Sequence, residues 1–396
     1  MTKLTILARG ALGALAVATG LAGSAGAEDY TWPRLMVIGT PGTTTGSFAS
    51  TNGWAPVMQK ETGTTVRIVP EDSELQRYRR LVERRNIQVT SVAAAMMRFQ
   101  IEGIDAFAAT QPAAMRILWH HNDTPWGFVV AGESEIRTMD DLKKGGVRVA
   151  EGAFASTMAT AVRKALPAYL GLDPETASDT LNFVPLSSYG ANCRSVTEGK
   201  ADVAYCAPIS SVLSEMEGAP GGIRWLDMPA AETEAWAGFL QYRPMLVPSK
   251  ITLGVESARG VEGMTSNYLY AVPADAEEDF AYNMAKWFNE SFAAYKDTHA
   301  LAARMSLEQF RAYLERSPLP VHDGVVRYLS EIGAWSEADE ARNQAAVAKM
   351  DAWVTARQAA LDEAKEKGVK IDAADPDFMA IYKAHTEGLE GFRSLL

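Results

Sequence analysis

Two loops rich in glycine and hydroxyl side chains are the parts of the sequence best suited to chemistry. One spans residues 39–47 (GTPGTTTGS) and the other spans residues 151–157 (EGAFAST), and each separates an apolar run from a helical pattern. At such a corner, free backbone N–H groups and the positive end of the helix favour carboxylate, phosphate or sulfate. The pair of loops therefore predicts contacts to a small anion. The alternative for the first loop is a solvated turn in which one hydroxyl caps the following helix.

Residue patterns for catalysis or metal binding are sparse. The first loop holds no lysine and does not end in Gly-Lys-Ser/Thr, which disfavours nucleotide hydrolysis. None of the five histidines lies in a His-x-x-x-His arrangement, and Cys-x-x-Cys and Gly-x-Ser-x-Gly motifs are absent from the sequence. We interpret His120 and His121 as surface or hinge residues. The sequence thus predicts a protein that is not an enzyme and that needs no metal or cofactor.

Cys193 and Cys206 are the only cysteines. Cys193 is expected in the first turn of a helix and Cys206 at the end of the following strand, two ends that lie on the same edge of a sheet. In an oxidising compartment this pair is a candidate disulfide, and two buried free thiols are the alternative.

The elements that must position the two loops alternate between strand and helix. Apolar runs predict strands in a first series and, after Pro125, in a second series, at residues 35–38, 66–69, 87–92, 128–130, 147–150, 183–184, 203–206 and 223–226. A last strand at 268–272 precedes a long helix from Asp275 to about Tyr295, and Ser73 with Gln76 predicts a capping box at an earlier helix. Such alternation favours an α/β fold with largely parallel sheets covered by helices.

The length predicts two lobes and an added tail. We expect a first lobe at residues 28–125, a second at 126–264, a return to the first at 265–335, and a C-terminal helical extension at 336–396. In the extension, Gly368 is placed to end one helix and Pro376 to begin another. A stripe at helical spacing usually packs, so we expect the extension to cover the first lobe, with a partner-binding arm as the alternative.

The N-terminus predicts export. Lys3 and Arg9 flank an apolar stretch that ends in a small-residue site before Glu28, the pattern of a signal peptide at residues 1–27 cleaved after Ala27. Cleavage is expected to leave a free periplasmic protein. Loss of Lys3 and Arg9 without any acid changes the formal charge from −11 to −13, which disfavours nucleic acid as a partner.

Four segments in this order resemble the TAXI family, the extracytoplasmic substrate receptors of one class of TRAP transporters. They are the opening loop at residues 38–46, the Asp-Leu-Lys step at 141–152, the Gly-Lys-Ala-Asp strand entry at 199–205, and the Pro-Val-His-Asp-Gly segment at 320–328. The resemblance spans roughly residues 35–335. Its departures are the bulkier second corner at Ala153–Thr157 and Phe48, where the family has an aromatic with a phenolic hydroxyl.

The resemblance implies a periplasmic-binding-protein fold of the second type, whose cleft closes on a solute, and a TRAP-type permease with fused small and large membrane subunits. Carried over by position, the residues expected to contact the solute are Thr43, Thr44, Thr45, Ser47, Thr90, Ser91, Phe154, Ala155, Ser156, Thr157, Tyr189, Asn192, Ala207 and Pro208. Arg194 is a candidate carboxylate fork, with a solvent-facing helix residue as the alternative. His322 is expected to hold the first lobe together.

The ligand and the downstream partner stay open at this point. Two positive helix ends favour an anion, and Trp126, Tyr189 and Phe154 favour an apolar or aromatic body, so a dicarboxylate, an amino acid and an aromatic acid all fit. A sensor that reports to a membrane kinase is the main alternative to a transport role, and an enzyme on the same fold is another.

Overall fold

A computed structural model describes Met1 and residues 30–395. The chain divides into two units, residues 1–31 and 32–396, and the fold given below is that of the second unit. Apart from Met1, the predicted signal peptide lies outside the described residues.

Lobe 1 is built on a sheet with the strand order β2-β1-β3-β10-β4, formed by β2 (Thr65–Pro70), β1 (Leu35–Thr40), β3 (Val89–Ala93), β10 (Glu262–Pro273) and β4 (Met115–Ala131). β1 pairs in parallel with β2 and β3, whereas β10 is antiparallel to β3, β4 and the short β9 (Val247–Lys250). β1 is mostly apolar, and both β1 and β3 are buried along almost their whole length, which is typical of parallel strands covered on both faces.

Lobe 2 is built on a second sheet in the order β4-β7-β5-β6, with β8 also paired to β4. Its strands are β5 (Val147–Gly152), β6 (Leu181–Leu186), β7 (Val203–Cys206) and β8 (Ile223–Leu226). β5 is parallel to β6 and β7, and β4 is antiparallel to β7 and β8. The architecture is therefore the predicted two-lobed α/β fold of the second type. The antiparallel pairs enter through the long strands β4 and β10.

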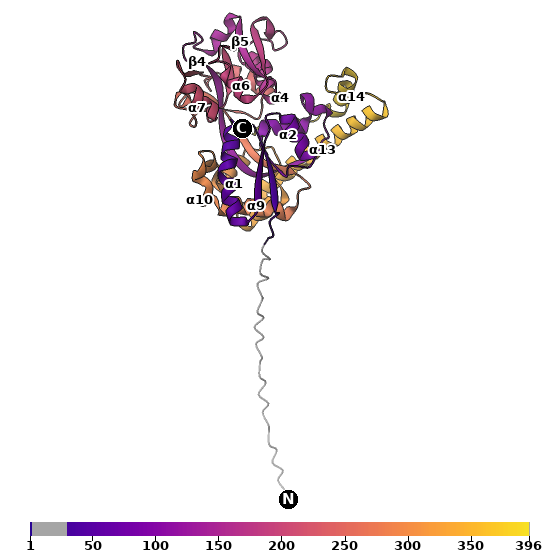
Figure 1. The fold of residues 1–396 in the computed structure, drawn as a ribbon. Helices are drawn as coiled ribbons and strands as arrows, with labels where there is room; N and C mark the ends of the chain where they lie inside the picture. The colour runs from indigo at the N-terminus through magenta and orange to yellow at the C-terminus, as the bar shows by residue number, and fades with distance from the viewer. Residues whose placement is uncertain (2–29, 396) are drawn as a thin grey trace. The chain divides into compact units, whose positions relative to one another are not determined.

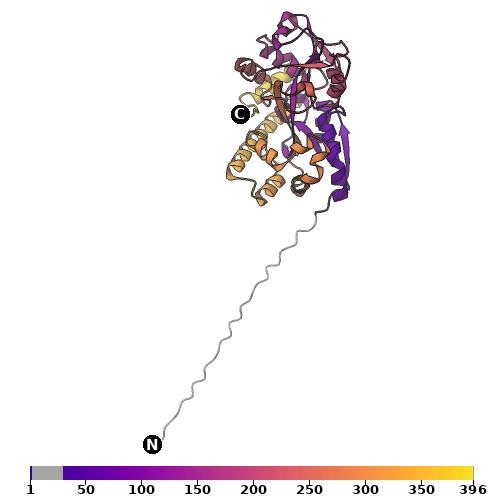
Figure 2. The ribbon, with the colours of Figure 1, turned by 90° about the vertical axis from the view of Figure 1, so that its left-hand side faces the viewer.

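β4 and β10 carry the chain between the lobes. β4 pairs with β10 as far as Trp126, whose partner is Met264, and with β7 from Gly127 onward. Figures 1 and 2 show the first and last thirds of the chain, indigo and orange, side by side in lobe 1, and the middle third, magenta, in lobe 2. The lobes are thus joined by adjacent antiparallel strands.

His120 and His121 lie within β4 and are fully buried, so of the two predicted alternatives, surface or hinge, the surface one is wrong. His121 Nδ1 lies 2.9 Å from Ser91 Oγ and its Nε2 lies 3.1 Å from the Tyr270 hydroxyl. His120 contacts the Arg304 carbonyl and the Asp123 carboxylate. These partners satisfy the ring nitrogens that burial removes from water.

Helices connect the strands of both lobes. Those of lobe 1 are α1 (Gly46–Thr62), α2 (Glu74–Val82), α3 (Ala94–Glu102), η1 (Asp105–Ala109), α9 (Glu278–Glu290), α10 (Phe292–Tyr295), η6 (Lys296–Thr298), η7 (Ala302–Arg304), α11 (Leu307–Leu314) and α12 (Asp323–Glu331). Those of lobe 2 are η2 (Met139–Lys144), α4 (Ser156–Thr160), η3 (Ala161–Ala165), α5 (Leu166–Tyr169), η4 (Ala177–Asp179), α6 (Tyr189–Arg194), α7 (Ser211–Glu217), α8 (Thr233–Tyr242) and η5 (Glu256–Ala258). The single helix expected from Asp275 to Tyr295 is two helices, with a break at Ser291.

Ser73 caps α2, and only half of the predicted capping box forms. Its Oγ accepts from the Gln76 N–H at 3.3 Å, but the Ser73 N–H donates to Glu71 rather than to the Gln76 side chain. Cys193 in α6 and Cys206 at the end of β7 are bonded to each other, with Cα atoms 6.0 Å apart.

The C-terminal extension forms α13 (Glu337–Glu366) and α14 (Pro376–Thr386). Gly368 takes a left-handed φ of 66° after α13, and Pro376 opens α14 behind the cap Asp375, as predicted. Met350 and Trp353 of α13 belong to the main core, so the helix packs on lobe 1. Arg357 is fully buried and donates to carbonyls of Gln100, Ile101, Phe107 and Thr110.

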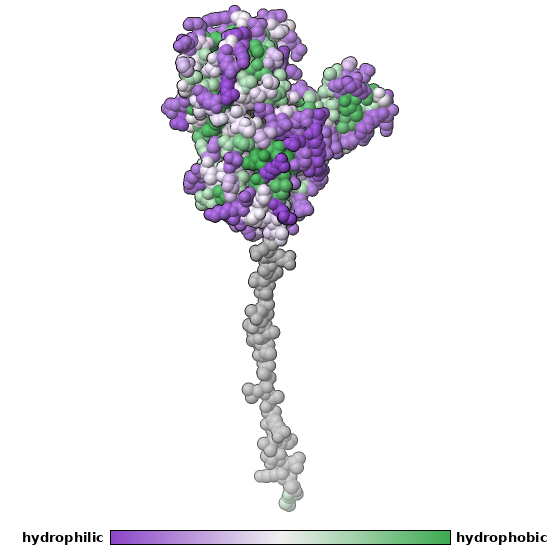
Figure 3. Space-filling view, viewed as in Figure 1, coloured by the Kyte–Doolittle hydropathy of each residue, from purple (hydrophilic) through white to green (hydrophobic). Residues whose placement is uncertain are grey.

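α14 packs back on α13 through an apolar cluster centred on Leu361, Phe378 and Tyr382. Figure 3 shows apolar residues gathered where these two helices meet, on a surface that is otherwise mostly hydrophilic there. Within residues 30–395, none of the helices combines the length and the apolar character required to span a bilayer.

Candidate functional site

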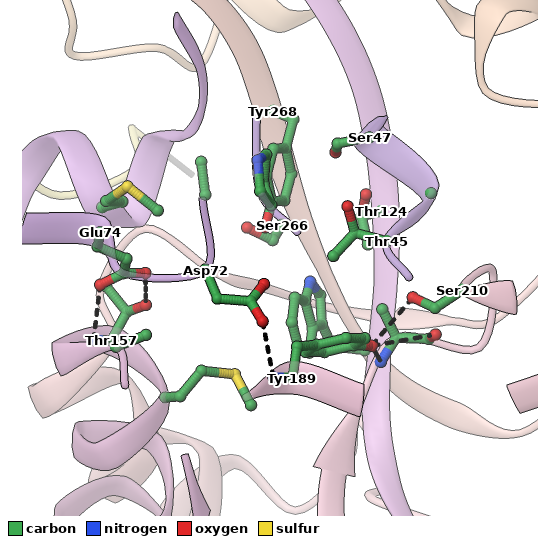
Figure 4. A pocket seen from close by; sticks show the side chains of 18 of the residues that line it. Thr45, Ser47, Asp72, Glu74, Thr124, Thr157, Tyr189, Ser210, Ser266 and Tyr268 are labelled. Atoms are coloured by element: carbon green, nitrogen blue, oxygen red, sulfur yellow. Dashed lines mark hydrogen bonds between the residues drawn. The ribbon is translucent and has the colours of Figure 1, made fainter. Parts of the chain in front are cut away.

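A cavity of about 60 Å³ lies between the lobes, at the carboxyl ends of the strands, with room for roughly four water molecules. Lobe 1 and the crossing strands contribute Pro41, Thr45, Gly46, Ser47, Asp72, Glu74, Arg77, Ala93, Met96, Thr124, Ser266 and Tyr268. Lobe 2 contributes Trp126, Phe154, Ala155, Thr157, Met158, Tyr189, Tyr205, Ala207, Ile209, Ser210 and Arg243. A ligand in this cavity would touch both lobes, and Figure 4 shows part of its lining.

The first corner uses the Thr45 hydroxyl to build the turn. Thr45 is the N-cap of α1: its Oγ1 accepts from the Phe48 N–H at 3.2 Å and donates to the Gly42 carbonyl at 2.8 Å. Thr45 and Ser47 still line the cavity, whereas Thr43 is exposed to solvent. The Thr44 carbonyl accepts from Ser211 Oγ of lobe 2 at 3.4 Å. The capped turn that the sequence offered as an alternative is therefore formed.

The Asp72 carboxylate of the protein itself accepts hydrogen bonds from backbone N–H groups, in the way expected of a bound anion. Its two carboxylate oxygens accept from the Gly42 N–H at 2.9 Å and from the Tyr189 N–H at 3.2 Å. Gly42 belongs to lobe 1 and Tyr189 is the first residue of α6 in lobe 2, so a single carboxylate bridges the lobes. Figure 4 shows Asp72 directed at the start of α6.

Glu74 fills the second corner in the same way. Its carboxylate accepts from the Thr157 N–H at 3.2 Å and from the Thr157 hydroxyl, at the beginning of α4 (Figure 4). Burial raises the pKa of Glu74 above its usual 4.5, against the hydrogen bonds from Thr157 and the charges of Arg77 and Arg243. Both anion-favouring corners of the sequence are thus satisfied, at least in part, by carboxylates of α2 and the loop before it.

Arg77 of α2 and Arg243, which follows α8, bring two guanidinium groups into the cavity, and their side chains are 2% and 5% exposed. Arg77 donates to the Glu71 carbonyl and to Met96 Sδ, and Arg243 donates to the Thr157 carbonyl. Burial lowers the pKa of both arginines, and the Glu74 charge opposes that effect. The Glu74 carboxylate is near enough to favour the charged form of both guanidiniums, although within residues 30–395 neither of them forms an ion pair.

Aromatic rings form the other wall. The Trp126 ring stacks on Tyr205, with ring centroids 4.7 Å apart, and meets the edge of Tyr189 at 6.1 Å. The Tyr189 hydroxyl accepts from the Ala207 N–H at 2.8 Å and lies 3.0 Å from Ser210 Oγ. Burial raises the pKa of Tyr189 to about 12, so this phenol stays protonated at neutral pH. The wall suits an apolar or aromatic surface.

Seven of the residues expected to contact a solute line the cavity: Thr45, Ser47, Phe154, Ala155, Thr157, Tyr189 and Ala207. The others do not line it: Thr43, Thr44, Thr90, Ser91, Ser156, Asn192, Arg194 and Pro208. Ser91 is taken up by His121, Asn192 donates to the Tyr205 carbonyl, and Arg194 pairs with Glu215 on the surface at 2.5 Å. In this structure the Arg194 guanidinium is engaged by Glu215 outside the cavity, which favours the alternative of a solvent-facing helix residue.

The charged residues of the cavity were missed by sequence reasoning. Asp72 and Glu74 directly follow the end of β2, where side chains reach the ligand edge of a sheet, and this position was a usable signal. Arg77 is one helical turn beyond Glu74 and shares its face. Arg243 had no such signal, because it follows a helix that no motif marked.

His322 lies outside the cavity, as expected. Its Nδ1 accepts from the Gly324 N–H and caps α12, and its Nε2 donates to the Ala276 carbonyl at 3.1 Å. In residues 30–395, no cluster of three or more His, Cys, Asp or Glu side chains is arranged to hold a metal ion.

The two lobes, the crossing strands and the shared cavity define a two-lobed binding-protein fold. The chain belongs to the NMT1-like family, whose model matches residues 38–333. The matched region contains all the residues that line the cavity and ends before α13. No curated protein matches the chain.

Solved structures resemble the chain at low sequence identity. The periplasmic binding protein BugD gives a TM-score of 0.44 at 13% identity, over 86% of this chain and 99% of that one. The alkanesulfonate-binding protein SsuA from Xanthomonas axonopodis pv. citri, bound to MOPS, gives 0.41 at 16% identity, over 86% and 96%. The substrate-binding protein of an amino acid ABC transporter gives 0.41 at 12% identity, over 68% and 98%.

Proposed function

We propose that this protein is a periplasmic solute-binding protein of a TRAP transporter, of the TAXI type. It captures a small anionic organic solute, an organic acid or an amino acid, between its lobes and delivers it to a permease with fused small and large membrane subunits. It binds the solute without converting it.

The observation that carries the proposal is the cavity shared by two lobes that only a few strands join. A ligand there contacts lobe 1 and lobe 2 at once, so it favours the arrangement in which the lobes meet. Membership of the NMT1-like family and the four TAXI-like segments support the same reading.

The test of binding is a thermal-shift screen of the mature protein, refolded to remove any bound solute, against organic acids, amino acids, sugars and amines. A solute at a hundred times its Kd stabilises the folded state by about 2.7 kcal/mol, which raises the melting temperature measurably. We expect hits among the acids. A folded protein that no solute stabilises would refute the proposal and favour a partner-dependent role, such as a sensor for a membrane kinase.

Delivery requires a separate measurement. A TRAP-type permease with fused small and large membrane subunits from the same organism, reconstituted in liposomes, should accumulate the identified solute only when the binding protein is present outside. N-terminal sequencing of the periplasmic form should begin at Glu28. Uptake that does not depend on the binding protein would separate the binding activity from a TRAP role.

A further inference from the structure

The unmet hydrogen-bonding capacity of the cavity consists of donors. Among the residues that the structure describes, three side-chain atoms of the lining are buried without a partner: Arg77 Nε, Arg243 Nε and Trp126 Nε1. Their side chains are between 2% and 8% exposed. Buried arginine Nε atoms without a partner also occur outside the cavity, among them those of Arg224 and Arg357, but here three such donors line one space, so a ligand in it would supply the acceptors.

The two guanidinium groups face a shared region from opposite lobes. Each lies close enough to Glu74 and Tyr268 to interact with them electrostatically. Within residues 30–395, the hydrogen bonds of these guanidiniums go to backbone carbonyls and a methionine sulfur, a weak acceptor, and not to a carboxylate.

We propose that Arg77 and Arg243 together bind one carboxylate or sulfonate group of the solute, and that the apolar remainder of the solute lies against the aromatic wall. The inference rests on the proposed solute-binding function and narrows its substrate class to small monoanions with an apolar body. Because one arginine comes from each lobe, the acid group gains both partners only when the lobes meet, which couples binding to closure.

A second acid group on the solute is disfavoured by the rest of the lining. Asp72 and Glu74 already place two carboxylates at the two corners, and both are engaged through hydrogen bonds from backbone and hydroxyl groups. Among the described residues, the remaining lining carries no further charged side chain and combines rings and Met158 with the hydroxyls of Thr45, Ser47, Thr124, Ser210 and Ser266. A dicarboxylate would set its second charge beside like charges or against aromatic rings.

The experiment measures binding by isothermal titration calorimetry with matched probes: butyrate, hexanoate, benzoate and butanesulfonate, their neutral amides, and succinate and glutarate. We expect the monoanions to bind at least tenfold more tightly than the amides and the dicarboxylates. Tighter binding of amides, amines or dicarboxylates would overturn the inference and leave the solute-binding function standing. No binding of any probe or screened solute would overturn both.

Variants assign the role to the two arginines. Arg77→Met and Arg243→Met should each weaken binding of the best monoanion by about a hundredfold or more, and Arg→Lys at either position should lose less. Without probe, both Met variants should still unfold in one cooperative thermal transition, so that a loss of affinity is measured on a folded protein.

Arg224→Met is the matched control. Arg224 is a partly buried arginine of lobe 2 outside the cavity. Its Nε also has no partner, but its other nitrogens donate to three carbonyls, those of Gly132, Ser134 and Ile136. Its replacement should lower the melting temperature and leave the affinity unchanged. Parent-like affinity in both Arg77→Met and Arg243→Met would overturn the inference.

Discussion

Glu74 is a buried carboxylate whose main partner, Thr157, belongs to the opposite lobe. Its oxygens accept from the N–H and the hydroxyl of Thr157, and no ion pair to it is formed within the described residues. Desolvation favours the protonated acid, whereas the Thr157 donors and the nearby arginines favour the carboxylate, and desolvation dominates because the pKa is raised. The protonation state of this one residue therefore affects how firmly the lobes hold together.

The raised pKa predicts a specific pH dependence. Between pH 4.5, the usual pKa, and the raised value, the folded state binds more protons than the unfolded state. The Glu74 contribution to stability is then fully present below pH 4.5 and is lost as pH rises through the folded pKa, by at most about 1.4 kcal/mol per pH unit. The difference in unfolding free energy between the parent and Glu74→Gln, measured in urea from pH 4.5 to 8, should fall as pH rises.

Asp202→Asn is the control of opposite sign. Desolvation raises the pKa of Asp202, but hydrogen bonds from Arg148 outweigh it and lower the pKa. The stability that Asp202 contributes is present above its unfolded pKa and is lost in acid. A flat difference for Glu74→Gln across the range would contradict the assignment of a raised pKa.

At the scale of elements, the disulfide between α6 and β7 holds α6 in place. The first residue of this helix, Tyr189, donates its N–H to Asp72. Cys193 and Cys206 are 13 residues apart in the sequence. Closing a loop of that size restricts the unfolded chain and stabilises the folded state by about 3 kcal/mol in the chain-entropy model.

The double variant Cys193→Ala with Cys206→Ala should lose about 3 kcal/mol of unfolding free energy, measured by urea unfolding in oxidising buffer. The reduced parent should behave like the double variant. If dithiothreitol leaves the parent's midpoint unchanged while it is shown to be reduced, the bond does not contribute to stability.

The extension is attached to lobe 1 mainly through α13 and the buried side chain of Arg357. Four carbonyls around the end of α3 and η1 accept from this guanidinium, so Arg357→Met would leave them without those donors in a buried place. We expect a loss of about 3 kcal/mol or more in unfolding free energy and an unchanged affinity for solute at 25 °C. Lys365→Met, on the exposed side of α13, should change neither; a stable Arg357→Met protein would show that α13 is only loosely attached.

The sequence indicated elements best where one pattern acted alone. β8 at residues 223–226 and the boundaries at Gly368 and Pro376 are where the apolar runs and the turn residues placed them. β4 was found only in its last part, because its first part holds Arg116, His120, His121, Asn122 and Asp123 and breaks the apolar pattern. Those polar residues are paired by partners far away in sequence, which local patterns do not reveal.

The sequence predicted where the candidate site lies but not the charged residues that line it. Corners at the ends of parallel strands gave Thr45, Ser47, Phe154, Thr157 and Tyr189. The backbone N–H groups at the corners donate to carboxylates of the same chain. This pairing depends on how the lobes meet, which the sequence does not show. For the same reason the anionic solute is better argued from Arg77 and Arg243 than from the helix ends.

At the scale of the whole molecule, contact between the lobes is what brings the site together. Asp72 accepts from amides of both lobes, Glu74 reaches Thr157, and Ser211 reaches Thr44. The contacts with Tyr189, Thr157 and Ser211 exist only when the lobes touch. The balance between open and closed forms is therefore set partly by residues that also line the cavity.

Asp72→Ala should shift that balance toward the open form. The Gly42 and Tyr189 N–H groups then lose their acceptor and regain water only when the lobes separate. We expect a larger radius of gyration by small-angle X-ray scattering and a severalfold weaker affinity for solute, because closure costs more. Asp275→Ala, which removes an exposed ion pair with Arg85 within lobe 1, is the control; scattering curves that coincide for Asp72→Ala and the parent would exclude this role.

The pairing of β4 with β10 also means that lobe 2 is an insertion with neighbouring ends. Trp126 and Met264 face each other in register just where the chain leaves and re-enters lobe 1. A two-residue Asn-Gly turn between them would close a β-hairpin and bypass the intervening 137 residues, counted from Gly127 to Gly263. Lobe 1 would keep its strand order β2-β1-β3-β10-β4. The topology is therefore that of a smaller domain with lobe 2 inserted at a single β-turn.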